Sequence, residues 1–257
     1  MNKLCRVLKL IWLNIGFYGA FVLMTAVLIV FISLPALCYL RYIKKYDKGS
    51  ATRRLVWYYG RAWTKLLILF VPVRLENCDR PLPKPCIITP NHQSFFDTYC
   101  FGFISAPDIV FAVRAWPFRM PFYRPYMRLA GYLNMESGSS EELLRQARAV
   151  LDKGSCIGIF PEGHRSPNDK IQRFRAGAFY LSAITGVPII PMCIDGTGIF
   201  LRKGSYLLRL ATIRIRVLDP IYPEQFSDFG EEAPLQLRHA AKAAIERSLE
   251  DMRSVCH

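Results

Sequence analysis

The sequence predicts an α/β domain with a mixed, largely parallel sheet flanked by helices, preceded by a hydrophobic membrane helix or helical hairpin. From about residue 71 onward, short apolar runs alternate with amphipathic helical patterns, and such alternation favours parallel strand pairing. Near the N-terminus, no charged residue and no histidine occurs from Leu10 to Leu40. We therefore expect a membrane-anchoring helical segment at 1–70 and an α/β domain at 71–257.

The apolar run is too long for one upright membrane span. As a single helix it would measure about 46 Å, against about 30 Å for the hydrocarbon core. It must therefore tilt and kink or fold back as a hairpin, with Gly16, Gly19 and Pro35 as candidate break points. A signal peptide is disfavoured because the run is too long and no A-x-A cleavage site follows.

Basic residues flank the run on both sides, and they predict which side of the membrane carries the α/β domain. Three precede it and four follow it: Lys3, Arg6 and Lys9, then Arg41, Lys44, Lys45 and Lys48. By the positive-inside rule, the stronger second flank places the domain in the cytosol. The next stretch, Thr52–Phe70, mixes arginines with Trp and Tyr, which suits either a helix at the headgroup level or a helix that caps the core.

The composition of the chain limits which classes of partner it is expected to bind. The 34 Lys and Arg against 20 Asp and Glu give a formal charge of +14, which favours nucleic acid, anionic lipid or phosphorylated ligands. The cations are spread along the chain without a recognised nucleic-acid motif, so we expect no nucleic-acid partner. The eight cysteines show neither C-x-x-C nor zinc-finger spacing, which predicts reduced thiols and no metal.

Apolar runs bounded by turn residues predict six strands, at Val73–Glu76, Cys86–Thr89, Ile109–Val113, Ser155–Phe160, Val187–Ile194 and Thr212–Leu218. Two helices are predicted most clearly, at Ser140–Lys153 and Pro234–Arg253. Ser139 and Gly154 are placed to cap the first of them. A polar, basic stretch at Lys44–Ala51 is the candidate linker between the membrane segment and the domain.

A histidine and an aspartate follow the second predicted strand. His92 and Asp97 are five residues apart across a predicted strand-to-helix turn. This spacing lets the carboxylate reach one imidazole nitrogen and leaves the other free to act as a base. The pattern alone is weak, because Ser94 or Asp97 equally suits a helix cap.

A second group of polar residues follows the strand predicted at 155–160. Glu162 is a carboxylate at the strand end, Gly163 permits a tight turn, and Arg165 is a phosphate-seeking fork. The cations Lys170, Arg173 and Arg175 come next. Such a run is often a solvated loop, but beside a strand-end carboxylate and a glycine it equally predicts an anion site.

Three blocks together resemble the phospholipid/glycerol acyltransferase family. Residues 91–97 (Asn-His-Gln-Ser-Phe-Phe-Asp) resemble its N-H-x-S-x-x-D signature, which contains the H-x4-D motif. Residues 160–166 (Phe-Pro-Glu-Gly-His-Arg-Ser) resemble its F-P-E-G-x-R-S block, and residues 187–191 (Val-Pro-Ile-Ile-Pro) its V-P-I-x-P block. The order of the blocks fits, and the hydrophobic N-terminus is similar to the membrane-docking helices of bacterial members.

This resemblance implies an O-acyltransferase domain at 71–257, in which His92 is the catalytic base and Asp97 orients it. It further implies substrate-binding positions at Asn91, Ser94, Glu162, Gly163, Arg165, Ser166, Arg173 and Arg175. The acceptor's own hydroxyl attacks a thioester, so no cofactor is expected beyond acyl-CoA or acyl carrier protein as co-substrate. The acceptor would be a lyso-lipid, with 1-acylglycerol 3-phosphate the commonest in the family, at the cytosolic face of the inner membrane.

One block departs from the family pattern. The family's middle block, G-x-x-F-I-x-R, ends in an arginine that helps to hold the acceptor phosphate, whereas residues 131–137 end in Ser137. Four arginines lie upstream among aromatic residues. They either take the place of the family's block arginine or face the membrane: Arg114, Arg119, Arg124 and Arg128. A different acceptor, such as an acylated amino acid, is therefore an alternative.

Two other classes of protein fit the sequence less well than an acyltransferase. A non-catalytic membrane protein that binds anionic lipid would not need His92. A serine hydrolase is disfavoured because the chain has no G-x-S-x-G elbow. Within the enzyme interpretation, His164 is the rival base, and we expect it to be a variable loop position.

Overall fold

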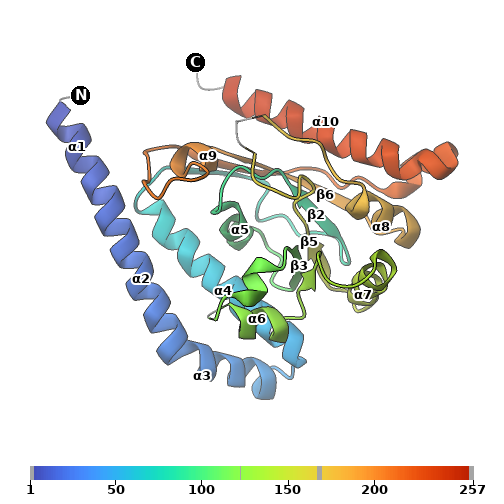
Figure 1. The fold of residues 1–257 in the computed structure, drawn as a ribbon, viewed down its shortest axis with the longest axis horizontal. Helices are drawn as coiled ribbons and strands as arrows, with labels where there is room; N and C mark the ends of the chain where they lie inside the picture. The colour runs from blue at the N-terminus through green and yellow to red at the C-terminus, as the bar shows by residue number, and fades with distance from the viewer. Residues whose placement is uncertain (1–2, 122, 167–169, 255–257) are drawn as a thin grey trace.

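A seven-stranded sheet forms the centre of the protein (Figure 1). The computed structural model describes residues 3–121, 123–166 and 170–254. The strands follow the spatial order β1-β7-β6-β2-β5-β3-β4. β6 pairs antiparallel with β7, and the other five neighbouring pairs are parallel, which confirms the mixed, largely parallel sheet. The bounds are β1 Val73–Glu76, β2 Ile87–Pro90, β3 Ile109–Val113, β4 Leu133–Asn134, β5 Cys156–Gly158, β6 Ile189–Asp195 and β7 Ile213–Val217.

Hydrophobic patterning located most of these elements. β1 and β3 have the predicted bounds, and the other four predicted strands differ only at their ends. β4 was missed because two residues, one of them Asn134, make no apolar run. The predicted helix at 140–153 is α7 (Ser140–Asp152), and the Ser139 hydroxyl accepts from the Glu142 N–H as its cap. The last helix is α10 (Ala233–Ser254).

The apolar run forms one continuous helix rather than a hairpin. Its α-helical parts are α1 (Lys3–Ile11), α2 (Phe17–Val27) and α3 (Ser33–Cys38), joined and followed by π-helical turns at 12–16, 28–32 and 39–43. None of the candidate break points reverses the chain. The helix instead bends where α2 meets α3, at the π-helical turn that precedes Pro35 (Figure 1). Among the described residues it is the one helix long and apolar enough to cross a membrane, over Val7–Ile43.

The chain reverses only after this helix, and it returns as α4 (Lys48–Ile68). The Asp47 side chain accepts from the N–H groups of Gly49 and Ser50, which fixes the start of α4. Figure 1 shows the long helix on the outside of α4, leaning away from the domain at its N-terminal end. The Asn14 amide also ties it to the domain, because it accepts from Leu208 N–H at 2.9 Å and donates to Leu208 O at 3.1 Å.

Helices cover both faces of the sheet. α7, α8 (Gly177–Thr185) and α10 cover one face, and their buried side chains pack on alternate residues of the strands, such as Ile87, Ile157 and Ile189. α4 and the short α5 (Asp97–Cys100) cover the other. The remaining α-helices of the described residues are α6 (Arg124–Leu129), which lies beside α4, and α9 (Thr197–Phe200), which follows β6.

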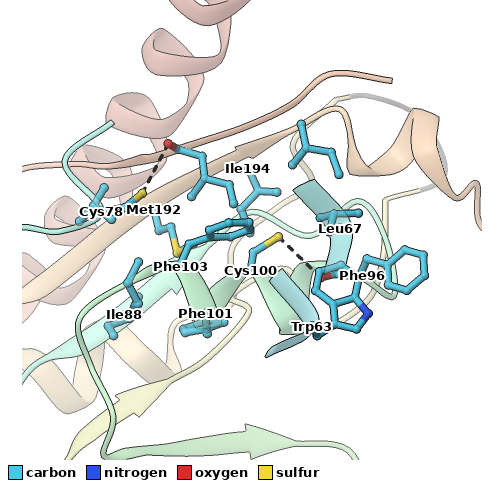
Figure 2. Close-up of a cluster of buried hydrophobic side chains, with 14 of the residues drawn as sticks. Trp63, Leu67, Cys78, Ile88, Phe96, Cys100, Phe101, Phe103, Met192 and Ile194 are labelled. Carbon is cyan, nitrogen blue, oxygen red and sulfur yellow. Dashed lines mark hydrogen bonds between the residues drawn. The ribbon is translucent and has the colours of Figure 1, made fainter. Parts of the chain in front are cut away.

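The core beneath α4 is rich in aromatic and sulfur-containing side chains (Figure 2). Trp63 and Leu67 of α4 lie in one cluster with Phe96 and Cys100, over Met192 of β6. Phe17 of the long helix belongs to the same cluster and meets the rings of Trp63 and Phe96 at centroid distances of 6.2 and 5.9 Å. The apolar helix therefore shares a core with the residues that follow β2.

The cysteines that the structure describes are all free thiols. Cys5 and Cys38 are exposed on the long helix, and five are buried in the domain: Cys78, Cys86, Cys100, Cys156 and Cys193. For the part of the chain described, this agrees with the prediction that the cysteines are reduced; Cys256 lies outside that part.

Candidate active site

The two predicted catalytic residues meet at the carboxyl end of β2. His92 lies in the loop after the strand, and Asp97 is the first residue of α5. His92 Nδ1 is 2.9 Å from Asp97 Oδ2. The His92 side chain is 16% exposed while that of Asp97 is fully buried. This contact engages one ring nitrogen and leaves Nε2 available for a substrate proton.

The Asp97 carboxylate is held by three further donors. Its Oδ2 accepts from the N–H groups of Gln93 and Ser94 at 2.6 and 2.7 Å. Its Oδ1 accepts from the Thr197 hydroxyl at 2.5 Å. A carboxylate so fixed cannot rotate away from the imidazole, so it sets both the tautomer and the orientation of His92.

The 160–166 block holds His92 from the other side. The Phe160 ring stacks on the imidazole with a centroid separation of 4.1 Å. Glu162 accepts from His92 N–H at 2.7 Å and from Gln172 N–H at 2.8 Å. Ser166 N–H donates to His92 O at 2.8 Å. The backbone of His92 is therefore bonded on both its N–H and its carbonyl.

Glu162 is 1% exposed. Burial raises the pKa of its carboxyl, although the two backbone N–H donors and the nearby His92 oppose this. Both carboxylate oxygens are already occupied by backbone N–H groups. This geometry suits a residue that positions the His92 loop, and contact between Glu162 and substrate stays a prediction.

Asn91 and Ser94 brace the same loop. The Asn91 amide exchanges two hydrogen bonds of 2.8 Å with the backbone of Ile194 in β6. The Ser94 hydroxyl donates to Leu201 O at 3.0 Å. Both side chains are buried, so their contacts fix the loop against the next strand and the segment after α9.

The remaining predicted positions surround the turn after β5. Gly163 has φ +74°, and a Cβ there would lie 2.7 Å from Arg175 Nε, so the turn needs glycine and the Arg175 side chain lies over it. Arg165 is half-buried, Arg173 and Arg175 are exposed, and Ser166 is buried. The structure thus gathers the set around the His92 loop and the turn at Gly163, except that Arg173 forms no hydrogen bond or ion pair with the others among the residues described.

Sequence reasoning missed Thr197. It lies one hundred positions from Asp97 in the chain, so no local spacing signals the pair. The segment after it touches the site again, because Lys203 Nζ donates to Arg165 O at 3.1 Å. The signal available for Thr197 is its position just after β6, in the run Asp-Gly-Thr. Polar residues that follow parallel strands lie at the same edge of the sheet.

The chemistry available is that of a base with an orienting carboxylate. His92 Nε2 can take a proton from a hydroxyl, and the buried Asp97 can stabilise the imidazolium that results. Among the residues described, no three His, Cys, Asp or Glu side chains come together as metal ligands.

Comparison with known proteins indicates the class of enzyme. The family model described as Acyltransferase matches residues 73–195, which include both blocks of the site. The solved structure of the 1-acyl-sn-glycerophosphate acyltransferase PlsC from Thermotoga maritima superposes with a TM-score of 0.74. That protein is 26% identical, and the match covers 98% of each chain.

Curated relatives carry related names. A chloroplastic 1-acyl-sn-glycerol-3-phosphate acyltransferase from Arabidopsis thaliana is 30% identical over 70% of this chain and 52% of its own length. One from Brassica napus is 33% identical over 58% of this chain and 44% of its own. The enzyme of that name from Salmonella typhimurium is 24% identical over 76% and 80%. The chain thus spans about half the length of the first two relatives.

The family model and the fold together define the class: residues 73–195 form a domain of the acyltransferase family, and these residues contain the His92–Asp97 pair. Within that family its likeness is to the 1-acylglycerol-3-phosphate acyltransferases.

Proposed function

We propose that this protein is a membrane-bound O-acyltransferase that moves a fatty acyl group from a thioester donor to the hydroxyl of a lyso-lipid. The first candidate acceptor is 1-acylglycerol 3-phosphate, because the relatives and the solved structure carry that activity in their names. The observation that carries the proposal is the His92–Asp97 pair, which leaves His92 Nε2 free.

The residues support one sequence of proton and bond changes. The acceptor hydroxyl gives its proton to His92 Nε2 while its oxygen attacks the thioester carbonyl carbon. The carbon–sulfur bond of the tetrahedral intermediate then breaks, and the thiolate takes the proton back from Nε2. Asp97 stabilises the imidazolium between the two transfers. No acyl-enzyme is needed, because the attacking oxygen belongs to the acceptor.

The long apolar helix supports membrane attachment. The exposed side chains of its 37-residue span at Val7–Ile43 are mostly apolar, and the helix measures about 56 Å along its bent path, more than a hydrocarbon core of about 30 Å. The helix therefore lies tilted or along the interface. With the basic flank at Arg41–Lys48 on the cytosolic side, residues 1–70 anchor a catalytic domain at 71–257 on the cytosolic face of the inner membrane.

Anchoring would bring the catalytic domain to an acceptor that stays in the bilayer. Donor and acceptor then meet at one surface, which removes part of the entropic cost of the reaction. An alternative acceptor is a different lyso-lipid, such as an acylated amino acid. Ser137 supports this alternative because it occupies the position where the family has an arginine.

The test is acyl transfer by purified membranes that carry wild-type, His92→Ala or His164→Ala protein. A panel of lyso-lipids is offered with labelled acyl-CoA and with acyl carrier protein thioester. We expect product from the wild type and from His164→Ala, since His164 is exposed, and none above background from His92→Ala.

Three results would decide otherwise. Equal losses for the two histidine variants would reject His92 as the base. Product only with an uncharged or zwitterionic lyso-lipid would reject 1-acylglycerol 3-phosphate as the acceptor, and acyl transfer with His92 as the base would still hold. No product with any acceptor, from protein that is folded and in the membrane, would favour a non-catalytic lipid-binding role.

A further inference from the structure

A second concave site lies at the same edge of the sheet as His92. It is a hollow of about 510 Å³ lined by Phe118, Arg119, Arg124, Arg128, Asn134 and Glu136. Phe118 and Arg119 lie between β3 and α6, Arg124 and Arg128 belong to α6, and Asn134 and Glu136 lie at and just beyond the end of β4. The hollow has the size of a site for a small organic ligand.

The hollow carries a net positive charge. Glu136 is neutralised by Arg114, whose Nε lies 2.6 Å from Glu136 Oε1, and it also accepts from Ala115 N–H at 3.1 Å. In the part of the chain that the structure describes, Arg119, Arg124 and Arg128 form no ion pair. Three guanidinium groups therefore face the hollow with their donors available for an anion.

The distance from His92 restricts which anion fits. The register places Thr89 of β2 level with Leu133 of β4, across β5 and β3. Three strand spacings of about 4.8 Å put the ends of these strands about 14 Å apart. His92 follows β2 and Glu136 follows β4, two residues beyond each strand.

The acceptor's phosphate does not span this distance. In 1-acylglycerol 3-phosphate the attacking hydroxyl and the phosphate are on adjacent carbons, so the phosphate stays beside His92. An extended pantetheine arm has about a dozen bonds between its sulfur and its phosphate, and at about 3.5 Å for every three bonds it reaches about 14 Å. A coenzyme A thioester at His92 would thus bring its phosphates to the arginines.

We propose that the hollow formed by Phe118, Arg119, Arg124, Arg128 and Asn134 binds the phosphates of an acyl-CoA donor. This inference rests on the proposed function and assigns the donor its own site, separate from the turn at Gly163 and Arg165. The three arginines match the negative charge of the diphosphate and the 3′-phosphate. Phe118 offers an aromatic surface next to them, on which an adenine ring can stack.

The test compares donors with and without phosphates. The full-length protein is purified in detergent as the wild type, as Arg119→Gln/Arg128→Gln, as Arg124→Gln, and as Arg247→Gln. Arg247 is an exposed arginine of α10, on the opposite face of the sheet, and it controls for the loss of one charge. Binding of free CoA is measured by calorimetry, and KM is measured for acyl-CoA, for an acyl N-acetylcysteamine thioester and for the lyso-lipid.

We expect the double variant to raise the Kd for CoA and the KM for acyl-CoA at least tenfold, and Arg124→Gln to raise both by a smaller factor. The KM values for the N-acetylcysteamine thioester and for the lyso-lipid should stay within twofold of the wild type, and Arg247→Gln should change nothing. Unchanged CoA binding by the double variant overturns the proposal. A rise confined to the lyso-lipid KM also overturns it and assigns the arginines to the acceptor.

Calorimetry measures CoA binding without turnover. The acyltransferase activity and the CoA phosphate site can therefore be rejected independently of each other. Protein that binds CoA through these arginines and transfers no acyl group rejects the acyltransferase and keeps the site. Protein that transfers acyl groups only from acyl carrier protein and does not bind CoA rejects the site and keeps the acyltransferase.

Discussion

Thr197 donates its hydroxyl hydrogen to Asp97 Oδ1 at 2.5 Å, on the side of the carboxylate opposite His92. Both side chains are fully buried. One oxygen of Asp97 therefore serves the imidazole and the His92 loop, and the other is held by the segment after β6. This contact ties the His92–Asp97 pair to a part of the chain outside the three short blocks that resemble the family.

Thr197→Val should lower kcat about tenfold with little change in KM, because one hydrogen bond to a buried carboxylate is lost while the shape is kept. Steady-state kinetics with the lyso-lipid and the thioester donor measure both parameters. Thr197→Ser is the matched control and should retain the wild-type kcat, because it keeps the hydroxyl donor. An unchanged kcat in the valine variant would show that the contact does not act through the Asp97 carboxylate.

Glu162→Gln separates a positioning role from a substrate-binding role. The amide replaces one of two acceptor oxygens, so either His92 N–H or Gln172 N–H would face an NH2 group. We expect kcat to fall at least tenfold with the lyso-lipid KM within threefold, because an unpaired buried donor costs about 1–3 kcal/mol and displaces the His92 loop. A large rise in KM at unchanged kcat would instead assign Glu162 to the acceptor.

Asp108 joins α4 to the start of β3. It accepts from Arg53 and from the Ser50 hydroxyl, and Arg53 also donates to Ala130 O at 2.9 Å. Burial alone would raise the pKa of Asp108, but these hydrogen bonds and the charge of Arg53 outweigh it and lower the pKa below its ordinary value of 3.8. The group therefore stabilises the fold above about pH 4, and this contribution is lost as the pH falls through the lowered value.

Asp108→Asn should accordingly destabilise the protein by about 2–4 kcal/mol at neutral pH, because it leaves Arg53 partly buried without its partner. The difference from wild type should shrink below pH 4. Thermal unfolding in detergent at pH 7 and pH 3.5 checks this. Asp219→Asn removes the partner of Arg80 from a pair whose acid is 91% exposed, so it should change the midpoint little at either pH. Equal destabilisation by Asp108→Asn at both pH values would exclude an ionic contribution.

The sequence predicted the sheet because its strands are buried, apolar and bounded by turns. It also predicted the His92–Asp97 contact, since both residues belong to one strand-to-helix turn. Thr197 and the Glu162–His92 backbone contact were out of reach, because each joins segments at least seventy positions apart. β4 was missed because its two residues are set by pairing with β3 rather than by hydrophobicity. The hairpin alternative for residues 10–40 was wrong because a helix with π-helical turns accommodates Gly16, Gly19 and Pro35 without reversing.

The most direct measurement is a double-mutant cycle on kcat/KM with His92→Ala, Asp97→Asn and the double variant, assayed with the acceptor that the wild type prefers. Asp97→Asn keeps an acceptor oxygen for the backbone N–H groups and loses the carboxylate. If Asp97 acts through His92, each single change should cost about 10²- to 10⁴-fold and the double variant should be no slower than His92→Ala. Losses that multiply would show that the two residues act independently and would contradict the assignment of His92 as a base oriented by Asp97.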